Sequence, residues 1–270
     1  MQIAVIGCGW LGLPLALSLK TSGHKVMATC RSQQKANELK KLGLNVEKFE
    51  LGNTLTDNRL ASLFESNVLV LNIPVGRKNP KIEHFTQHMQ ALLKHAANSQ
   101  IQKVIFVSTT SVYADNSGIY TEQSPTHPQS QSGKINLTVE ALVREYFSDC
   151  STIIRPAGLV GKGRHPANYL AGKTDLLNPN NVVNLIHQDD VIQSIECIIK
   201  NEVWGQTLIL SASEHPTRHN YYTWAAEKLN LAKPSFIEAL GQPSGKLIDA
   251  SSSLGILGMQ LKYSSPYNML

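Results

Sequence analysis

Short hydrophobic runs alternate with helix-spaced patterns along the first half of the chain. The runs are rich in β-branched residues and predict strands near residues 2–6, 25–30, 46–51, 68–73, 103–108 and 152–155. Strands that alternate with helices form a parallel sheet with helices on both faces. The pattern therefore predicts an α/β fold, a Rossmann-type doubly wound parallel sheet.

Two segments between these runs show the spacing of amphipathic helices. The first has one apolar stripe, made of Ile82, Phe85, Met89, Leu92, Leu93 and Ala96. The second covers residues 133–148 and places Val139, Leu142, Val143 and Tyr146 on one face. We expect both stripes to pack on the sheet as core.

The pattern becomes irregular after residue 155, where glycines and prolines recur. A helix over 189–200 and a strand over 206–210 still fit a sheet. We therefore predict a Rossmann domain at residues 1–160, whose cofactor is considered with the glycine-rich loop below. A small C-terminal substrate-side lobe would occupy 161–270, partly interleaved with the sheet over 188–211.

Composition and charge narrow the class of protein. Of the 270 residues, 42% are hydrophobic and 17% charged, which is typical of a soluble globular protein. The net charge of +5 comes from scattered lysines and arginines, without the aromatic-interleaved basic stripe of a nucleic-acid binder. We expect a small-molecule substrate, with no nucleic-acid or membrane partner.

The apolar stretch 3–19 resembles a signal peptide, but no basic residue precedes it and three glycines interrupt it. We interpret it as a buried strand entering a helix. The four cysteines are far apart in sequence and form neither a CxxC motif nor a cluster with histidine. The sequence therefore predicts no metal site and a cytoplasmic protein.

A glycine-rich loop follows the first predicted strand and opens a helix. Gly7, Gly9 and Gly12 form the pattern GxGxxG, with Cys8, Trp10 and Leu11 between them. In dinucleotide-binding loops the first glycine makes a tight turn, the second lets the pyrophosphate approach, and the third lets helix and strand pack closely. We predict that these six residues bind a dinucleotide cofactor.

The end of the second strand bears on the choice of cofactor. An NAD site usually places an acidic residue there, whereas this sequence has Arg31 and Ser32. These groups suit a 2′-phosphate, so we prefer NADP over NAD; the alternative is that Arg31 is solvated. Ile73, Pro74 and Val75 follow the fourth strand as further cofactor contacts. Arg77 could meet a phosphate or solvent equally well.

Three further segments resemble one superfamily. They are Ser-Thr-Thr-Ser-Val-Tyr at 108–113, Arg-Pro-Ala-Gly-Leu-Val-Gly at 155–161 and Asn-Leu-Ile-His-Gln-Asp-Asp-Val at 184–191. With the glycine loop, they resemble the extended short-chain dehydrogenase/reductases, in particular the NAD-dependent epimerase/dehydratase-like bacterial proteins. The ending at 261–267 is similar to the tail of this subgroup. The resemblance implies a homodimer.

The resemblance also implies catalytic and cofactor residues. The family's Ser/Thr, four residues before a tyrosine, falls on Thr109, with Tyr113 as that tyrosine and Arg155 as a further cofactor contact. Ser108 and Thr110 are neighbouring candidates for the same role, and the alternative is that Thr109 caps a turn. The family's central Tyr and Lys fall on Ser132 and Asn136, which lack an acidic phenol and a charge. Lys134 lies about 200° around the helix from Ser132 and is a poor substitute. The candidate catalytic residues are thus Thr109, Tyr113 and Ser132.

Other groups could supply the missing proton transfer. The polar segment 109–132 is long enough for a binding loop or lid and contains Tyr120, Glu122 and His127, each of which could equally lie on the loop surface. Tyr169 and Lys173 repeat the Tyr-xxx-Lys spacing, most simply by coincidence. We interpret His187 and Asp190 as structural residues that hold the substrate lobe.

A basic cluster follows residue 161, made of Lys162, Arg164, His165 and Lys173. It would suit a phosphorylated or carboxylated substrate, with a solvated surface as the alternative. Tyr120, Arg164 and His165 are therefore the candidate substrate contacts.

Two functions fit these features. The first is an NAD(P)-dependent epimerase or oxidoreductase that acts on a small anionic or nucleotide-linked substrate. The second is a non-catalytic NADP-binding sensor or partner-binding protein that kept the fold. Thr109 and the long loop favour the enzyme, whereas Ser132 and Asn136 favour the binder. Fold alone does not decide between them; we favour the enzyme.

Overall fold

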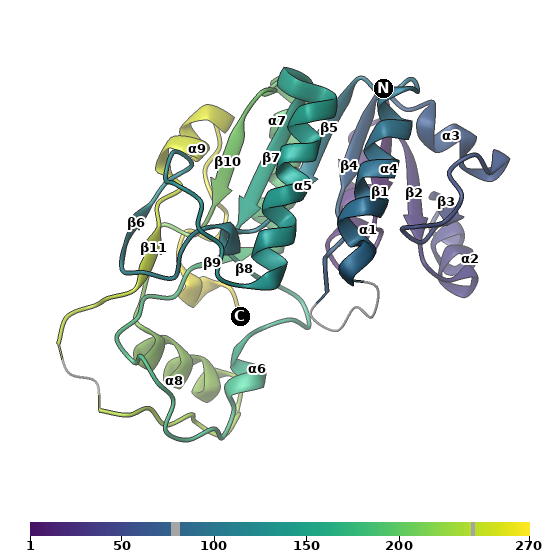
Figure 1. Ribbon diagram of the computed structural model, residues 1–270. Helices are drawn as coiled ribbons and strands as arrows, with labels where there is room; N and C mark the ends of the chain where they lie inside the picture. Colours follow the sequence, from purple (N-terminus) through teal and green to yellow (C-terminus); the bar gives the residue numbers. More distant parts are fainter. Residues whose placement is uncertain (77–81, 239–240) are drawn as a thin grey trace. The chain divides into compact units, whose positions relative to one another are not determined.

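The computed structural model describes residues 1–76, 82–238 and 241–270 (Figure 1). The chain forms two compact units, each made of three segments. Unit 1 comprises Met1–Thr109, Ser130–Ile154 and Ile198–Thr207. The remaining segments form unit 2: Thr110–Gln129, Arg155–Cys197 and Leu208–Leu270. Each unit is thus made of segments that alternate along the chain. The predicted border between functional domains at residue 160 stays a prediction.

One seven-stranded sheet has the order β10-β7-β5-β4-β1-β2-β3. Its strands are β1 (Gln2–Ile6), β2 (Lys25–Cys30), β3 (Asn45–Lys48), β4 (Val68–Leu71), β5 (Lys103–Val107), β7 (Ser151–Pro156) and β10 (Thr207–Leu210). Pairing is parallel; in the centre, Ile3 lies opposite Val26 on one side and Val68 on the other. The predicted Rossmann-type α/β fold is confirmed.

The helices of unit 1 follow the strands in alternation. They are α1 (Gly12–Thr21), α2 (Gln33–Lys41), η1 (Asn58–Leu60), α3 (Ala61–Phe64), η2 (Ile82–His84), α4 (Phe85–Ala97), α5 (Gln131–Phe147) and η4 (Ser148–Cys150). Helix α2 was not predicted because only Ala36 and Leu39 of its residues are buried. A mostly polar helix gives no apolar stripe to detect.

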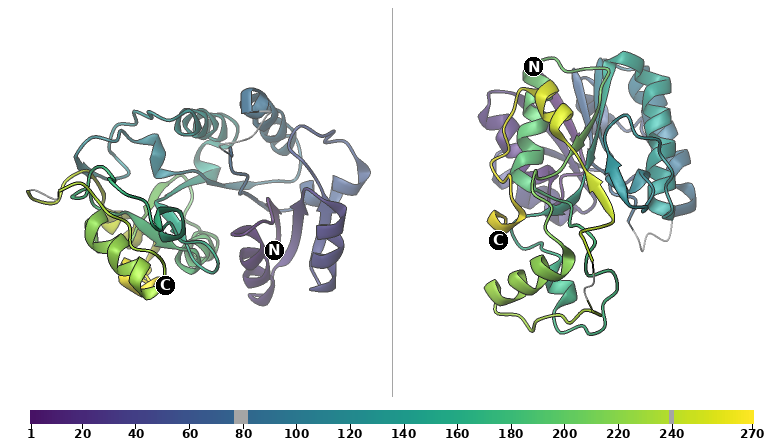
Figure 2. Two further views of the ribbon diagram at one scale, coloured as in Figure 1. Left: turned by 90° about the horizontal axis from the view of Figure 1, so that it is seen from below. Right: turned by 90° about the vertical axis from the view of Figure 1, so that its left-hand side faces the viewer.

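The core of unit 1 lies between the sheet and the helices α4 and α5, which pack side by side (Figure 2). Successive strand side chains point to opposite faces, so Ala4 and Ile6 of β1 join this cluster. The predicted stripe is confirmed from Phe85 to Ala96, all of whose members are buried. Ile82 precedes α4 in η2 and is partly buried.

Unit 2 has smaller elements around its own core. They are η3 (Thr110–Val112), β6 (Gly118–Tyr120), β8 (Gly158–Val160), α6 (Ala167–Leu170), β9 (Leu185–His187), α8 (Arg218–Lys228), β11 (Lys246–Ile248), α9 (Ser251–Leu257) and η5 (Pro266–Asn268). Helix α7 (Gln188–Lys200) belongs to it up to Cys197. Its core gathers Val160, Val183, Leu185, Tyr221 and Ala225.

The segment expected as a long loop at 109–132 is partly regular. It contains η3 and strand β6, and β6 pairs in parallel with β11 near the other end of the chain (Figure 1). Gly118 lies opposite Lys246, and Lys246 Nζ lies 2.8 Å from the Asp115 carboxylate. The sequence did not predict this strand because its partner is more than a hundred residues away.

Within the described ranges, none of the helices is both long and apolar enough to cross a membrane.

Candidate functional site

Gly7 makes the first turn of the glycine loop in unit 1. Its φ of 102° lies where residues with a side chain are strained. Its N–H donates to Thr29 Oγ1 at 3.3 Å, and the N–H of Cys8 donates to the Thr29 carbonyl at 2.8 Å. A Cβ on Gly7 would lie 2.2 Å from the carbonyl oxygen of Asn72. Only glycine fits this turn between β1, β2 and β4.

Gly12 begins α1 in close contact with the same turn. A Cβ there would lie 2.2 Å from the carbonyl oxygen of Gly7. The side-chain amide of Asn72 donates to that carbonyl at 3.1 Å. Asn72 thus fixes the loop from the end of β4, a role that the sequence did not predict because no local pattern joins residues 65 positions apart.

Gly9 differs from Gly7 and Gly12, the other two glycines of the loop. Among the described residues, a Cβ on Gly9 would meet only the Gly7 carbonyl oxygen, at 4.0 Å, so these residues do not require glycine there. The space above it is open, and Leu11 provides no side-chain cap for the start of α1. An uncapped helix N-terminus beside an open glycine fits a pyrophosphate. Cys8 and Leu11 are buried, so they can meet such a ligand only through their backbones.

One basic residue follows β2 and another lies in the first turn of α2. Arg31 is exposed, and Ser32 caps α2 by accepting from the N–H of Lys35 at 3.3 Å. Burial and the neighbouring Cys30 raise the pKa of the Cys8 thiol to about 11, while the charge of Lys35 acts to lower it. The sequence missed Lys35 because it missed α2.

The segment after β4 has a mixed environment. Ile73 is partly buried against the core of unit 1, and Val75 is buried within it. Pro74 is exposed. Apolar packing explains Ile73 and Val75, and their predicted cofactor contacts stay a prediction. Arg77 lies outside the described residues.

The start of α5 places Ser132 and Asn136 one turn apart. Ser130 caps the helix by accepting from the N–H of Gly133 at 3.1 Å. The side-chain amide of Asn136, which is buried, donates to the Ser132 carbonyl at 2.8 Å. Lys134 is exposed, consistent with its place on another side of the helix.

A buried polar pair lies beside Thr109. Ser108 Oγ donates to Glu140 Oε1 at 2.5 Å, and both residues are buried. The N–H of Ser108 donates to the Ile154 carbonyl at 2.8 Å. The end of β5 is thereby fixed to both α5 and β7, and Thr109 follows at once, half-buried.

In unit 2 the structure brings three predicted residues together. The Arg155 guanidinium donates to Tyr113 Oη at 2.7 Å and lies 5.1 Å from the centre of its ring. The rings of Tyr113 and Tyr120 are 5.6 Å apart. Tyr113 is only 1% exposed, so its hydroxyl lies in a buried cluster. The predicted catalytic role of Tyr113 and cofactor role of Arg155 stay predictions.

His165 is buried with both ring nitrogens engaged. Nδ1 accepts from the N–H of Ala167 at 3.2 Å, and Nε2 lies 2.9 Å from Tyr221 Oη. Burial lowers the pKa of His165 to about 4. A substrate contact through this ring would require one of these bonds to open. Arg164 is exposed in the turn after β8, and Tyr169 is 75% exposed.

Asp190 fastens the C-terminal segment of unit 2. Its buried carboxylate accepts from the backbone N–H groups of Lys262, at 2.7 Å, and Tyr263, at 3.3 Å. Burial raises the pKa of Asp190, and these two bonds oppose the rise. His187 stacks on Tyr263 with ring centres 3.9 Å apart. The contacts agree with a structural interpretation of His187 and Asp190.

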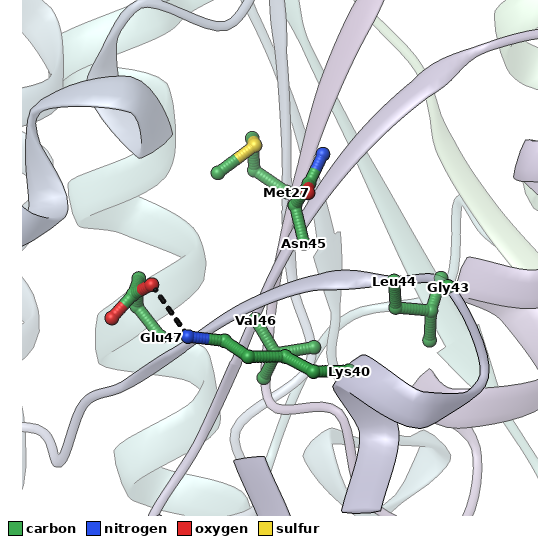
Figure 3. Close-up of a pocket in the computed structure, with 7 residues that line it drawn as sticks. All are labelled: Met27, Lys40, Gly43, Leu44, Asn45, Val46 and Glu47. Carbon is green, nitrogen blue, oxygen red and sulfur yellow. Dashed lines mark hydrogen bonds and ion pairs between the residues drawn. The ribbon is translucent and has the colours of Figure 1, made fainter. Parts of the chain in front are cut away.

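A surface cavity of about 460 Å³ lies elsewhere in unit 1 (Figure 3). Met27 and Asn45 line it, with the ion pair between Lys40 Nζ and Glu47, 3.0 Å apart, on its wall. These residues lie toward the start of β2 and β3, whereas the glycine loop follows the carboxyl end of β1. Ligands of such sheets bind at the carboxyl ends of the strands, so this cavity is not the dinucleotide site.

Among residues 1–76, 82–238 and 241–270, no three His, Cys, Asp or Glu side chains gather as metal ligands. The parallel sheet and the geometry of Gly7, Gly9 and Gly12 define the class: a dinucleotide-binding protein of the Rossmann type. The chain belongs to the NAD dependent epimerase/dehydratase family, whose sequence pattern matches residues 3–206. The family resemblance seen in the sequence is thereby confirmed.

The matches to known relatives and solved structures cover nearly the whole chain. Protein YeeZ of Escherichia coli (strain K12) is 33% identical, covering 99% of this chain and 98% of its own. A structure of a candidate NAD-dependent epimerase/dehydratase from Methylobacillus flagellatus has a TM-score of 0.80 at 25% identity. The match covers 99% of this chain and 95% of that structure's chain. The structure of UDP-glucuronic acid 4-epimerase from Bacillus cereus, in complex with NAD, has a TM-score of 0.78 at 18% identity. The match covers 98% of this chain and 94% of the epimerase chain. The last likeness concerns the fold alone.

Proposed function

We propose that this protein binds NADP in unit 1 and uses it to transform a small anionic substrate, as an oxidoreductase or epimerase. The observation that carries the cofactor choice is the charge at the end of β2. Arg31 and Lys35 flank the Ser32 cap of α2, and no carboxylate occurs between residues 28 and 35. An acidic residue there would repel a 2′-phosphate.

The same position suits a phosphate on physical grounds. Arginine binds phosphate through a planar fork of N–H donors, and lysine adds a second positive charge. The N-terminus of α2 contributes its partial positive charge toward an anion. These three contributions act in one direction and support NADP over NAD.

When bound, the nicotinamide supplies hydride transfer. In this proposal the Thr109 hydroxyl donates a hydrogen bond to a substrate oxygen and orients it. Lys162 and Arg164, both exposed in unit 2, attract the substrate's negative charge. A nucleotide-linked acidic sugar would meet these requirements, and a structural neighbour is a UDP-glucuronic acid 4-epimerase.

A second candidate function is a non-catalytic NADP-binding sensor. It is favoured by the start of α5, where Asn136 donates its amide to the Ser132 carbonyl. An amide carries no charge that would lower the pKa of a neighbouring hydroxyl. A sensor would bind NADP without transferring hydride.

Thermal unfolding with each dinucleotide tests the cofactor choice. A ligand at about 100 times its dissociation constant stabilises the native state by about 2.7 kcal/mol. We expect NADP to give the larger shift, Arg31→Asp to reverse the preference, and Lys35→Gln to weaken NADP about tenfold. Lys41→Gln, at the far end of α2, is the matched control and should change nothing. A larger shift with NAD, or none with either, would contradict the proposal.

Hydride exchange separates the enzyme from the sensor. Reduced NADP deuterated at C4 should pass its label to an acceptor drawn from nucleotide sugars and small keto acids. Thr109→Ala should slow this exchange, while Thr138→Ala, on the exposed side of α5, should not. Binding without exchange would favour the sensor. Unchanged exchange in Thr109→Ala would remove the role given to Thr109.

A further inference from the structure

A second cavity lies within unit 2, where the segment after β10 meets β11 and α9. It has a volume of about 200 Å³. Its polar lining comes from Ser211, Ser213, His215, Asp249 and Ser251. None of these residues was a candidate in the sequence, because they come from two segments more than thirty residues apart.

Two lining residues contribute buried polar atoms that lack a partner. In the described part of the chain, Ser211 Oγ and His215 Nδ1 have no hydrogen-bond partner, and Ser211 is wholly buried. Such atoms are uncommon in native structures because a buried polar group without a partner costs free energy. Two of them in the wall of one cavity indicate that a ligand or ordered water completes their bonding.

The protonation of His215 fixes what Nδ1 can do. Burial lowers the pKa of His215, so the ring is neutral near pH 7. A neutral imidazole has one protonated and one unprotonated ring nitrogen, so in one of its two tautomers Nδ1 presents a lone pair and acts as an acceptor.

Asp249 adds negative charge to the same wall. Its Oδ1 accepts from the Ser251 N–H at 2.9 Å and from Ser251 Oγ at 2.6 Å. These bonds lower the pKa of Asp249, so it is ionised near pH 7. The part of the lining that the structure describes includes neither lysine nor arginine. The cavity thus offers acceptors and one anion.

We propose that this cavity binds a small primary ammonium ion that carries a short alkyl chain. An ammonium has three N–H donors and no acceptor, which complements His215 Nδ1, Ser211 Oγ and the Asp249 carboxylate. The apolar side chains of Leu247 and Leu254 line the same space and suit the alkyl part. At about 30 Å³ for each water-sized group, the cavity admits about six or seven such groups.

Entry of the ligand requires a small movement. Ser211 Oγ and His215 Nδ1 are covered by other protein atoms, so a side-chain rotation accompanies binding. Serine rotates between staggered positions at little cost.

Calorimetric titration of the full chain with n-butylammonium chloride tests the proposal. We expect saturable binding at millimolar concentrations. 1-Butanol, which matches its shape without charge, should bind about tenfold more weakly, as should tetramethylammonium, which lacks N–H donors. Equal binding of 1-butanol would overturn the proposal, because the site would then not require a positive charge. Equal binding of tetramethylammonium would also overturn it, because the site would then not require N–H donors. The absence of saturable butylammonium binding would also overturn it.

Variants locate the binding. Asp249→Asn keeps an oxygen that can accept from Ser251 but removes the charge, and Leu254→Phe fills the cavity. Each variant should bind butylammonium about tenfold more weakly. Asp149→Asn, exposed in unit 1, and Leu229→Phe, after α8, are the matched controls. If Leu254→Phe fails to fold, Ser211→Ala supplies the second test, because it removes a bond to the ligand but no bond within the protein. Unchanged affinity in Asp249→Asn would refute the assignment.

Discussion

The side-chain amide of Asn136 donates a hydrogen bond to the backbone carbonyl of Ser132, one turn earlier in α5. These are the two positions at which the sequence resemblance predicts the family's tyrosine and lysine. Residues four apart lie on one face of a helix, so the geometry for that pair is present. The charge and the phenol are absent from these positions. If the prediction holds, the helix keeps the spacing of the family's pair without its chemistry.

Restoring the two side chains should restore their electrostatic coupling. In Ser132→Tyr/Asn136→Lys, the ammonium lies one turn from the introduced phenol and should lower the pKa of that phenol by about 1–3. Ultraviolet titration of tyrosinate, compared with Ser132→Tyr alone, measures the difference. An identical midpoint in the single and double variants would show that the side chains do not meet.

The glycines of the loop should respond differently to alanine. Gly9→Ala should fold normally, because its Cβ meets no atom closer than 4.0 Å, but it should lose the thermal shift with NADP. Gly12→Ala should destabilise the fold by more than about 3 kcal/mol, because its Cβ lies 2.2 Å from the Gly7 carbonyl oxygen. Chemical denaturation and thermal shift measure the two effects. A Gly9→Ala protein that binds NADP as well as the parent would show that the ligand does not approach Gly9.

The Ser108–Glu140 pair should contribute to stability. Ser108→Ala removes a hydrogen-bond donor from a buried carboxylate and should lower the free energy of unfolding by about 1–3 kcal/mol. Glu140→Gln keeps an acceptor without the charge and should cost less than Glu140→Ala. Urea denaturation measures these values, with Thr138→Ala on the same helix as control. A loss below about 0.5 kcal/mol in Ser108→Ala would match an ordinary surface substitution instead.

His165 should make unfolding depend on pH. Its pKa in the folded protein, about 4, lies below the ordinary value of 6.5, so the unfolded chain binds the proton more readily. Neutral His165 therefore favours the folded state, and this contribution to the free energy of unfolding is fully present above pH 6.5. It is lost as pH falls toward 4, by up to about 3 kcal/mol. Denaturation of His165→Gln and the parent across this range measures the difference. His127→Gln, exposed in unit 2, is the control, and parallel pH profiles for parent and His165→Gln would contradict the prediction.

The fold was largely predictable because the sheet is buried on both faces. Strands β1 and β2 have the predicted bounds, and α4 follows its apolar stripe. Strand β3 ends at Lys48, three residues before its predicted end. Helix α2, with its polar surface, gave no periodic signal, and the sequence therefore missed Lys35.

The candidate site was predictable only in its local part. The loop from Gly7 to Gly12 is contiguous in the chain, and Gly7 and Gly12 each meet a steric demand of the backbone. Asn72, Glu140 and the wall of Ser211 and His215 depend on contacts between distant segments. No spacing rule reports such contacts.

The sequence by itself determined the Rossmann-type α/β class, the dinucleotide loop and the family, because repeating hydrophobic patterns and a contiguous motif record local requirements of the backbone. Only the tertiary structure decided that Asn72 fixes the loop and that Gly9 alone of its three glycines faces open space. It also decided that β6 pairs with β11 and that His165 is enclosed by Tyr221. These facts depend on which side chains fold against one another, and burial and hydrogen bonding between distant segments are set only once the chain is packed.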